Sequence, residues 1–132
     1  MRSPYQVLVL DDEEVVCERL KAHLEKKGCE VEAFTESQTA IDRMAKKSFD
    51  VVITDVKMEG PSGLDVLHFV RRENPATQVI VITGYGSIES IREAEYGGAF
   101  EFINKPFTSK AIEALTLKAA KKARKQGAGG KR

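Results

Sequence analysis

Five short runs rich in apolar and β-branched residues recur along the chain. They cover Gln6–Leu10, Cys29–Phe34, Asp50–Thr54, Gln78–Thr83 and Phe100–Asn104. The first, third and fourth runs are apolar at nearly every position, which is typical of strands that are covered on both faces of a sheet. We therefore expect five strands, and we expect these three to be buried.

The segments between the runs have the spacing of helices. Val16, Leu20 and Leu24 repeat every four residues in the first segment, and Gly28 follows where such a helix would stop. Ser37 is the expected N-cap of the second helix. The predicted helices are Glu13–Lys27, Ser37–Lys47, Gly63–Glu73, Ser87–Tyr96 and Thr108–Lys125.

Strand and helix therefore alternate five times, which indicates an α/β fold with a parallel sheet and helices on both faces. The expected architecture is a flavodoxin-like, doubly wound (βα)5 sandwich with strand order 2-1-3-4-5. A chain of 132 residues suits a single domain. We expect this domain over residues 1–125, followed by a basic, disordered tail at 126–132.

Polar side chains stand where four of the five predicted strands end. Asp11 and Asp12 follow the first strand, Asp55 follows the third, Thr83 ends the fourth, and Lys105 comes just after the fifth. In an open parallel sheet, ligands bind beyond the carboxyl ends of the strands, at the point where the strand order reverses. Strands one and three would be neighbours there, so the three carboxylates should share one pocket.

Three carboxylates in one pocket repel each other, so a cation should compensate them. Lys105 supplies one positive charge, and an oxygen-rich site without sulfur suits Mg²⁺, which accepts phosphate oxygens as further ligands. Asp55 stands alone and is the expected nucleophile for a phosphoryl group. Asp12 or Glu13 taken singly could instead be an ordinary residue at a helix start.

Composition and charge limit the other classes of function. Cys17 and Cys29 lack metal-binding spacing, and we expect reduced, partly buried thiols in a cytoplasmic protein. Seven of the 21 basic residues and none of the 20 acidic ones lie at or after Lys118. The basic end could touch nucleic acid, but we expect a solvated last helix, no direct nucleic-acid binding and no membrane segment.

Four stretches together resemble the receiver domain of two-component response regulators, over about residues 5–125. They read "VLVLDDEE", "VVITDVKMEGPSGLDVL", "VIVITGYGSIES" and "GAFEFINKPF". The residues of the last two stretches are most similar to those of receivers of the nitrogen-regulator type, which precede a sigma-54-activating ATPase. The resemblance implies a signalling switch, with a sensor histidine kinase as phosphoryl donor.

The resemblance also assigns roles around the acids. It implies that Asp55 accepts the phosphoryl group from a phosphohistidine. It implies that Asp12, Asp55 and the backbone carbonyl of Lys57 bind Mg²⁺, with Asp11 assisting, often through water. The protein would then catalyse only its own phosphorylation and dephosphorylation, and would not be an enzyme with a separate substrate.

The switch itself is implied for a second group of residues. Thr83 and Phe102 form the switch pair, Lys105 pairs with the phosphoryl group, and the Lys105–Pro106 peptide is often cis. The surface of the fourth helix, fifth strand and fifth helix then changes, and binds an output domain, a partner protein or a second receiver in a homodimer.

The chain departs from the family pattern at a few positions. Glu59 stands where Pro is usual and Ser62 where Asp is frequent. Glu95, Tyr96 and Gly97 alter the fourth helix, which bears on the output surface and leaves the pocket chemistry intact.

Tyr85 and Lys57 each lie two residues after a key pocket residue. We expect them to flank the path of the hydrolytic water, with Tyr85 lengthening the lifetime of the phosphoryl group.

Two other functions remain open. A vestigial receiver would act as an interaction module that is independent of phosphorylation. A Mg²⁺-dependent phosphohydrolase would need a general acid two residues after its nucleophile, where this chain has Lys57. These motifs do not specify the cognate kinase or the output partner. They are equally compatible with a receiver that stands alone and with one that belongs to a longer regulator.

Overall fold

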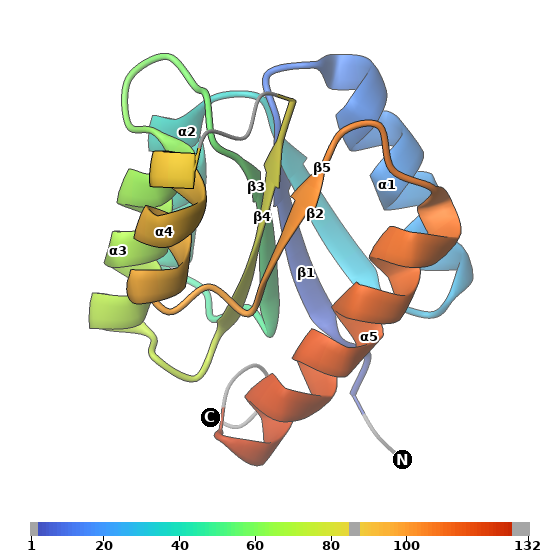
Figure 1. Cartoon of the computed structure of the whole chain (residues 1–132). Helices are drawn as coiled ribbons and strands as arrows, with labels where there is room; N and C mark the ends of the chain where they lie inside the picture. Colours follow the sequence, from blue (N-terminus) through green and yellow to red (C-terminus); the bar gives the residue numbers. More distant parts are fainter. Residues whose placement is uncertain (1–2, 85–87, 128–132) are drawn as a thin grey trace.

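The computed structural model describes residues 3–84 and 88–127, and within them strands and helices alternate as predicted (Figure 1). The elements, in chain order, are β1 (Gln6–Leu10), α1 (Glu14–Lys26), β2 (Glu30–Phe34), α2 (Ser37–Met44), β3 (Val51–Asp55), α3 (Gly63–Glu73), β4 (Gln78–Thr83), α4 (Ile88–Tyr96), β5 (Glu101–Asn104) and α5 (Ser109–Lys125).

The five strands form one parallel sheet in the order β2-β1-β3-β4-β5, so the predicted fold is confirmed. Helices α1 and α5 cover one face of the sheet, and α2, α3 and α4 cover the other (Figure 1). The strand order reverses between β1 and β3. The carboxyl ends of these two strands lie side by side, because Leu10 is in register with Thr54.

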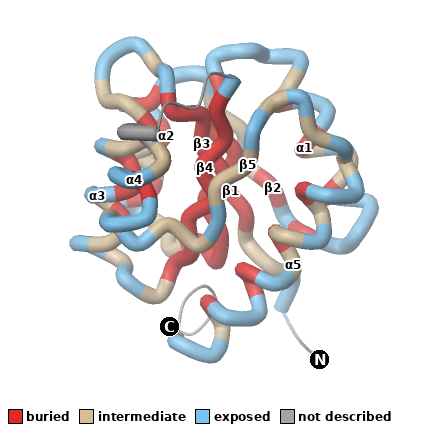
Figure 2. Tube along the Cα trace, viewed as in Figure 1, coloured by how far each residue is buried: buried red, intermediate tan, exposed pale blue. Residues whose placement is uncertain are grey.

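Alternation along the strands divides the core into two halves. On β1, Val7 and Val9 pack on the side of α1 and α5, whereas Leu8 and Leu10 pack on the side of α2, α3 and α4. Strands β3 and β4 are buried along their whole length, and β1 is buried from Val7 to Leu10 (Figure 2). Burial on both faces explains why these segments are apolar at nearly every position.

Several boundaries differ from the predicted ones. Asp55 is the last residue of β3, because it pairs in register with Ile82 of β4. Helix α2 ends at Met44 instead of Lys47, and the chain turns there to bury Phe49. The predicted start of α4, Ser87, lies outside the described residues.

Ser37 is not the N-cap of α2, because Glu36 occupies that position and Ser37 is the buried first residue of the helix. Its hydroxyl donates a hydrogen bond to the backbone carbonyl of Glu59, at 3.1 Å. The prediction was wrong because a serine at the start of a helix pattern can either cap its own helix or bind a distant backbone carbonyl. Only the position of the loop that contains Glu59 decides between these two.

Both cysteines are free thiols, and both are buried more completely than expected. The Cys17 thiol lies within hydrogen-bond distance of the carbonyls of Asp11 and Phe34. No helix among the described residues combines the length and the apolar composition needed to span a bilayer.

Candidate functional site

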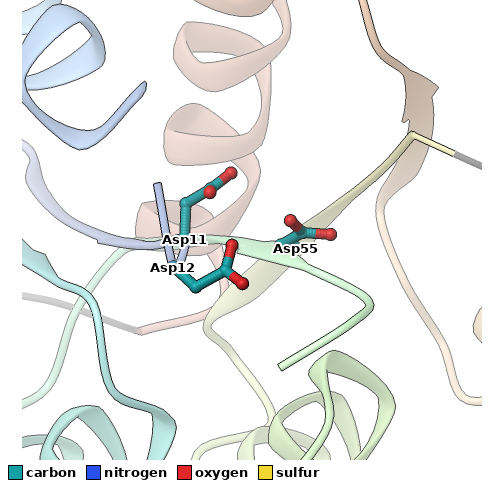
Figure 3. A group of neighbouring side chains, drawn as sticks. All are labelled: Asp11, Asp12 and Asp55. Carbon is teal, nitrogen blue, oxygen red and sulfur yellow. The ribbon is translucent and has the colours of Figure 1, made fainter. Parts of the chain in front are cut away.

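Three carboxylates gather at the ends of two neighbouring strands (Figure 3). Asp11 and Asp12 directly follow β1, and Asp55 ends β3. One carboxylate oxygen of each residue lies within 4.8 Å of the others. The structure therefore brings together the acids that the sequence predicted to meet.

The three acids differ in their exposure to water. Asp11 is 1% exposed and Asp55 is 7% exposed, whereas Asp12 is open to solvent. Burial raises the pKa of Asp11, and the hydrogen bond from the backbone N–H of Glu13 and the contact with Lys105 only partly oppose this. The nearby charge of Asp55 raises the pKa of Asp11 further. Burial and the neighbouring carboxylate thus both disfavour the ionised form of Asp11.

Lys105 provides a positive charge in direct contact with the cluster. Its Nζ lies 3.2 Å from Oδ2 of Asp55, 3.0 Å from Oδ2 of Asp11 and 3.0 Å from Oε1 of Glu13. Burial lowers the pKa of the lysine, but the hydrogen bonds to Glu13 and Asp11 outweigh this, and the pKa is raised overall. One ammonium group is thereby shared among three carboxylates.

The contact between Glu13 and Lys105 was not predicted. Glu13 is the N-cap of α1, yet its side chain accepts no capping hydrogen bond and instead faces the lysine. The sequence carried a hint of this in its third consecutive acid after β1, but a helix start explains such an acid equally well.

Thr83 and Lys105 are joined through the backbone. Thr83 is the buried last residue of β4, and its carbonyl accepts a 2.7 Å hydrogen bond from the N–H of Lys105. The Lys105–Pro106 peptide is cis, as the resemblance implied. Asp12, Asp55, Lys57, Thr83 and Lys105 are among the residues that line an open pocket of about 560 Å³.

Phe102 lies apart from this pocket. It sits on β5 in register with Val81 and packs, half-buried, against the core beneath α2, α3 and α4. The predicted switch pair is therefore placed on adjacent strands, with Thr83 in the pocket and Phe102 outside its lining. Tyr85 lies outside the described residues, so its shielding role stays a prediction.

The loop after β3 is held against the sheet at both of its ends. Val56 donates to the carbonyl of Ile82 at 2.9 Å and accepts from the N–H of Gly63 at 2.8 Å. A Cβ on Gly63 would lie only 2.0 Å from the carbonyl oxygen of Asp55, so glycine is required for α3 to begin this close to the acceptor. Ser62 then starts α3 through a reciprocal capping box with Asp65.

These residues fit a hard divalent cation. The ligand atoms are oxygens, two of the acids are largely buried, and their like charges are crowded around the Lys105 ammonium. Mg²⁺ prefers carboxylate and carbonyl oxygens and keeps open positions for water and phosphate. Asp11, Asp12 and Asp55, together with the backbone carbonyl of Lys57, a residue that lines the same pocket, would hold it.

The family model "Response regulator receiver domain" matches residues 7–117. The chain belongs to this family. It is therefore a receiver domain of the two-component response regulators, and receivers of this family generally bind Mg²⁺ in an acidic pocket like the one described above.

The chain is similar to several named proteins. It is 33% identical to a putative NtrX-like response regulator of Rickettsia typhi over 119 residues, 89% of this chain and 25% of that protein. A receiver domain from Clostridium thermocellum has a TM-score of 0.84 and 34% identity, covering 92% of this chain and 97% of that one.

The beryllofluoride-activated receiver dimer of NtrC4 has a TM-score of 0.78 and 32% identity, covering 91% of this chain and 97% of that one. The similarity to receivers of the nitrogen-regulator type is thus confirmed. The chain spans about a quarter of the length of the NtrX-like relatives.

Proposed function

We propose that this receiver is a phosphorylation-dependent switch and that Asp55 accepts the phosphoryl group. The observation that carries the proposal is the position of Asp55, which lies among two further carboxylates and 3.2 Å from the Lys105 ammonium. A phosphoryl group on Asp55 would add negative charge here, and the pocket already holds the groups that can balance it.

The proposed transfer starts from a phosphohistidine on a sensor histidine kinase. An oxygen of the Asp55 carboxylate attacks phosphorus, the P–N bond breaks, and its electron pair returns to the imidazole, which takes up a proton. Mg²⁺ would neutralise charge on the phosphoryl oxygens. Lys105 would exchange a carboxylate contact for a phosphoryl oxygen, and the Thr83 hydroxyl would donate to another. No other substrate is turned over.

The proposed output runs through the surface formed by α4, β5 and α5. Thr83 and Phe102 lie on the two adjacent strands that lead to this surface. Tyr96 is 90% exposed at the end of α4, Glu95 and Glu101 are exposed acids, and α5 carries exposed lysines. We infer that an output domain, a partner protein or a second copy binds here.

If the partner at this surface is a second copy of the chain, phosphorylation produces a homodimer. The exposed acids of α4 and β5 and the exposed lysines Lys118 and Lys122 of α5 have opposite charge, which suits a two-fold contact. The related NtrC4 receiver is a dimer when activated by beryllofluoride. We place the protein in the cytoplasm, where a kinase domain would reach it, without direct nucleic-acid or membrane contact.

The test is intact mass spectrometry after incubation with acetyl phosphate and Mg²⁺. We expect one added phosphoryl group, which is absent with EDTA and absent in Asp55→Asn. An adduct that survives in Asp55→Asn would contradict the assignment of the acceptor.

Failure of the proposal would take one of two forms. No adduct and no beryllofluoride binding would indicate a vestigial pocket and an interaction module. Continuous release of phosphate from a small phosphoester would indicate a phosphohydrolase instead.

A further inference from the structure

Ser37 connects two elements that the proposed mechanism does not otherwise link. It is 1% exposed and is the first residue of α2. Its hydroxyl donates a 3.1 Å hydrogen bond to the carbonyl of Glu59. The next residue, Gly60, has φ +75, and a Cβ there would lie 3.8 Å from the Ser37 hydroxyl oxygen.

This hydrogen bond fixes one end of a short backbone segment. On the other side, Val56 is bound to β4 through its N–H and to α3 through its carbonyl. Lys57 lies between the two anchored carbonyls of Val56 and Glu59, and it lines the pocket beside Asp55. The backbone around Lys57 is therefore held on both sides, and Ser37 provides the anchor on the side of Glu59.

Towards Asp55 the segment has further restraints, because the Lys57 N–H donates to Oδ1 of Asp55 at 3.3 Å and Met58 packs against the core. The Ser37 anchor matters at the other end of the segment, around Glu59 and Gly60. Glu59 has no ring to fix its backbone torsion, as a proline would, and Gly60 has no side chain to restrict it. Without the Ser37 hydroxyl, the carbonyl of exposed Glu59 could bind water instead, so the segment could move while the fold remains intact.

We propose that Ser37 is a positioning residue for the metal site and that it holds the Lys57 carbonyl in the direction needed to bind Mg²⁺. The inference rests on the proposed function, because it requires a Mg²⁺ ion in this pocket. Ser37 contacts neither the ion nor the phosphoryl group. It acts through the loop, as residues outside the first ligand shell of a metal commonly do.

The test compares Ser37→Ala with Thr39→Ala. Thr39 is exposed in the same turn of α2, and its hydroxyl donates to the Glu36 side chain, so this control removes a hydroxyl from the helix start without touching the loop. Mg²⁺ affinity is measured by titration calorimetry, the urea midpoint is measured without Mg²⁺, and hydrogen exchange is measured at the amides of residues 57–60.

We expect Ser37→Ala to weaken Mg²⁺ binding about three- to tenfold, the loss typical of one hydrogen bond, and to speed exchange in the loop. Thr39→Ala should bind Mg²⁺ within about twofold of the wild type. Equal affinities for Ser37→Ala and wild type would overturn the inference, as would an equal loss in both variants. A wild type that binds no Mg²⁺ would overturn the proposed function as well.

Discussion

Strand β3 carries an aspartate at each end, and the two are neutralised in different ways. Asp50, just before the strand, is fully buried. It accepts from Nε and Nη2 of Arg124 at 2.7 and 3.0 Å, and from the backbone N–H of Gln6 at 2.7 Å. One carboxylate there has a whole guanidinium group, which also donates to the carbonyls of Ser3 and Pro4.

At the carboxyl end of β3, several carboxylates share one cationic group. One Lys105 ammonium is shared by Asp11, Glu13 and Asp55, and Asp12 stands beside them. Both carboxylate oxygens of Asp50 already accept hydrogen bonds, so this saturated pair has no capacity left for a ligand. The unbalanced cluster at Asp55 costs stability and leaves room for a divalent cation. The two ends are separated by five residues of strand, roughly 16 Å, so they should respond independently.

The largest effect should come from breaking the saturated end. Arg124→Met keeps an apolar stem but removes the guanidinium group, which lies over the Tyr5 ring, and leaves Asp50 buried without its charge partner. We expect the free energy of unfolding to fall by about 3–5 kcal/mol, measured by urea denaturation. Lys125→Met, at the exposed neighbouring position, should change it by less than about 0.5 kcal/mol.

A second substitution distinguishes two causes of the lost stability: the buried charge of Asp50 left without a partner, and the lost packing of the arginine side chain. Adding Asp50→Asn to Arg124→Met should restore part of the stability, because the buried charge is then gone. If the double variant is no more stable than Arg124→Met, the loss comes from packing of the arginine and the comparison of the two ends is wrong.

The next effect in size concerns the unbalanced end, where Mg²⁺ should stabilise the fold. At a free concentration a hundredfold above Kd, linkage predicts a gain of about 2.7 kcal/mol in the free energy of unfolding. Asp12→Asn should lose most of this gain. Arg124→Met should keep all of it, since the two ends are independent; a gain that vanishes there would show that the ends are coupled.

Asp11→Asn tests the cost of the unbalanced cluster directly. Burial raises the pKa of Asp11, so the folded state accommodates the ionised form less favourably than the unfolded state does. We expect the variant to be more stable than the wild type by about 1 kcal/mol at pH 7 without Mg²⁺, by urea denaturation. Saturating Mg²⁺ should reduce or reverse the difference.

The raised pKa of Asp11 also decides how the stability difference between Asp11→Asn and the wild type should depend on pH. Above the raised pKa of the folded protein, Asp11 is charged in both states and destabilises the fold. Below its ordinary value of 3.8 it is protonated in both states, so the advantage of Asp11→Asn should shrink as the pH falls through this range. An advantage that grows towards low pH would contradict the role of burial.

The sequence predicted the unbalanced end better than the saturated one. Asp11, Asp12 and Asp55 each follow an apolar strand, and parallel strands bring such positions to one edge, so local pattern and topology were sufficient. Arg124 and Asp50 are 74 residues apart, and Arg124 is one basic residue among several at the end of α5. Nothing in its spacing marks it as the one that turns inward.

The same reason explains the two contacts that the sequence missed around the site. Glu13 faces Lys105 across 92 residues, and Ser37 binds Glu59 across 22. In both cases the residue type also suits a helix start, which is the local explanation. Only the assembled positions of distant loops decide whether a side chain caps its own helix or binds elsewhere.

The smallest effect is expected for Glu13→Gln, which removes the exposed member of the Lys105 cluster. The Glu13 side chain is 62% exposed, so its ion pair with Lys105 is screened by water, unlike the pair at Asp50. We expect the free energy of unfolding, measured by urea denaturation at low salt, to change by a few tenths of a kcal/mol. Glu14→Gln, at the next exposed position, should change it by a similar amount and serves as the matched control. In about 1 M salt, where screening acts within roughly 3 Å, the difference between Glu13→Gln and wild type should disappear. A loss of about 2 kcal/mol or more that persists in salt would show that Lys105 is as firmly held as Arg124, and then it could not exchange a carboxylate for a phosphoryl oxygen at low cost.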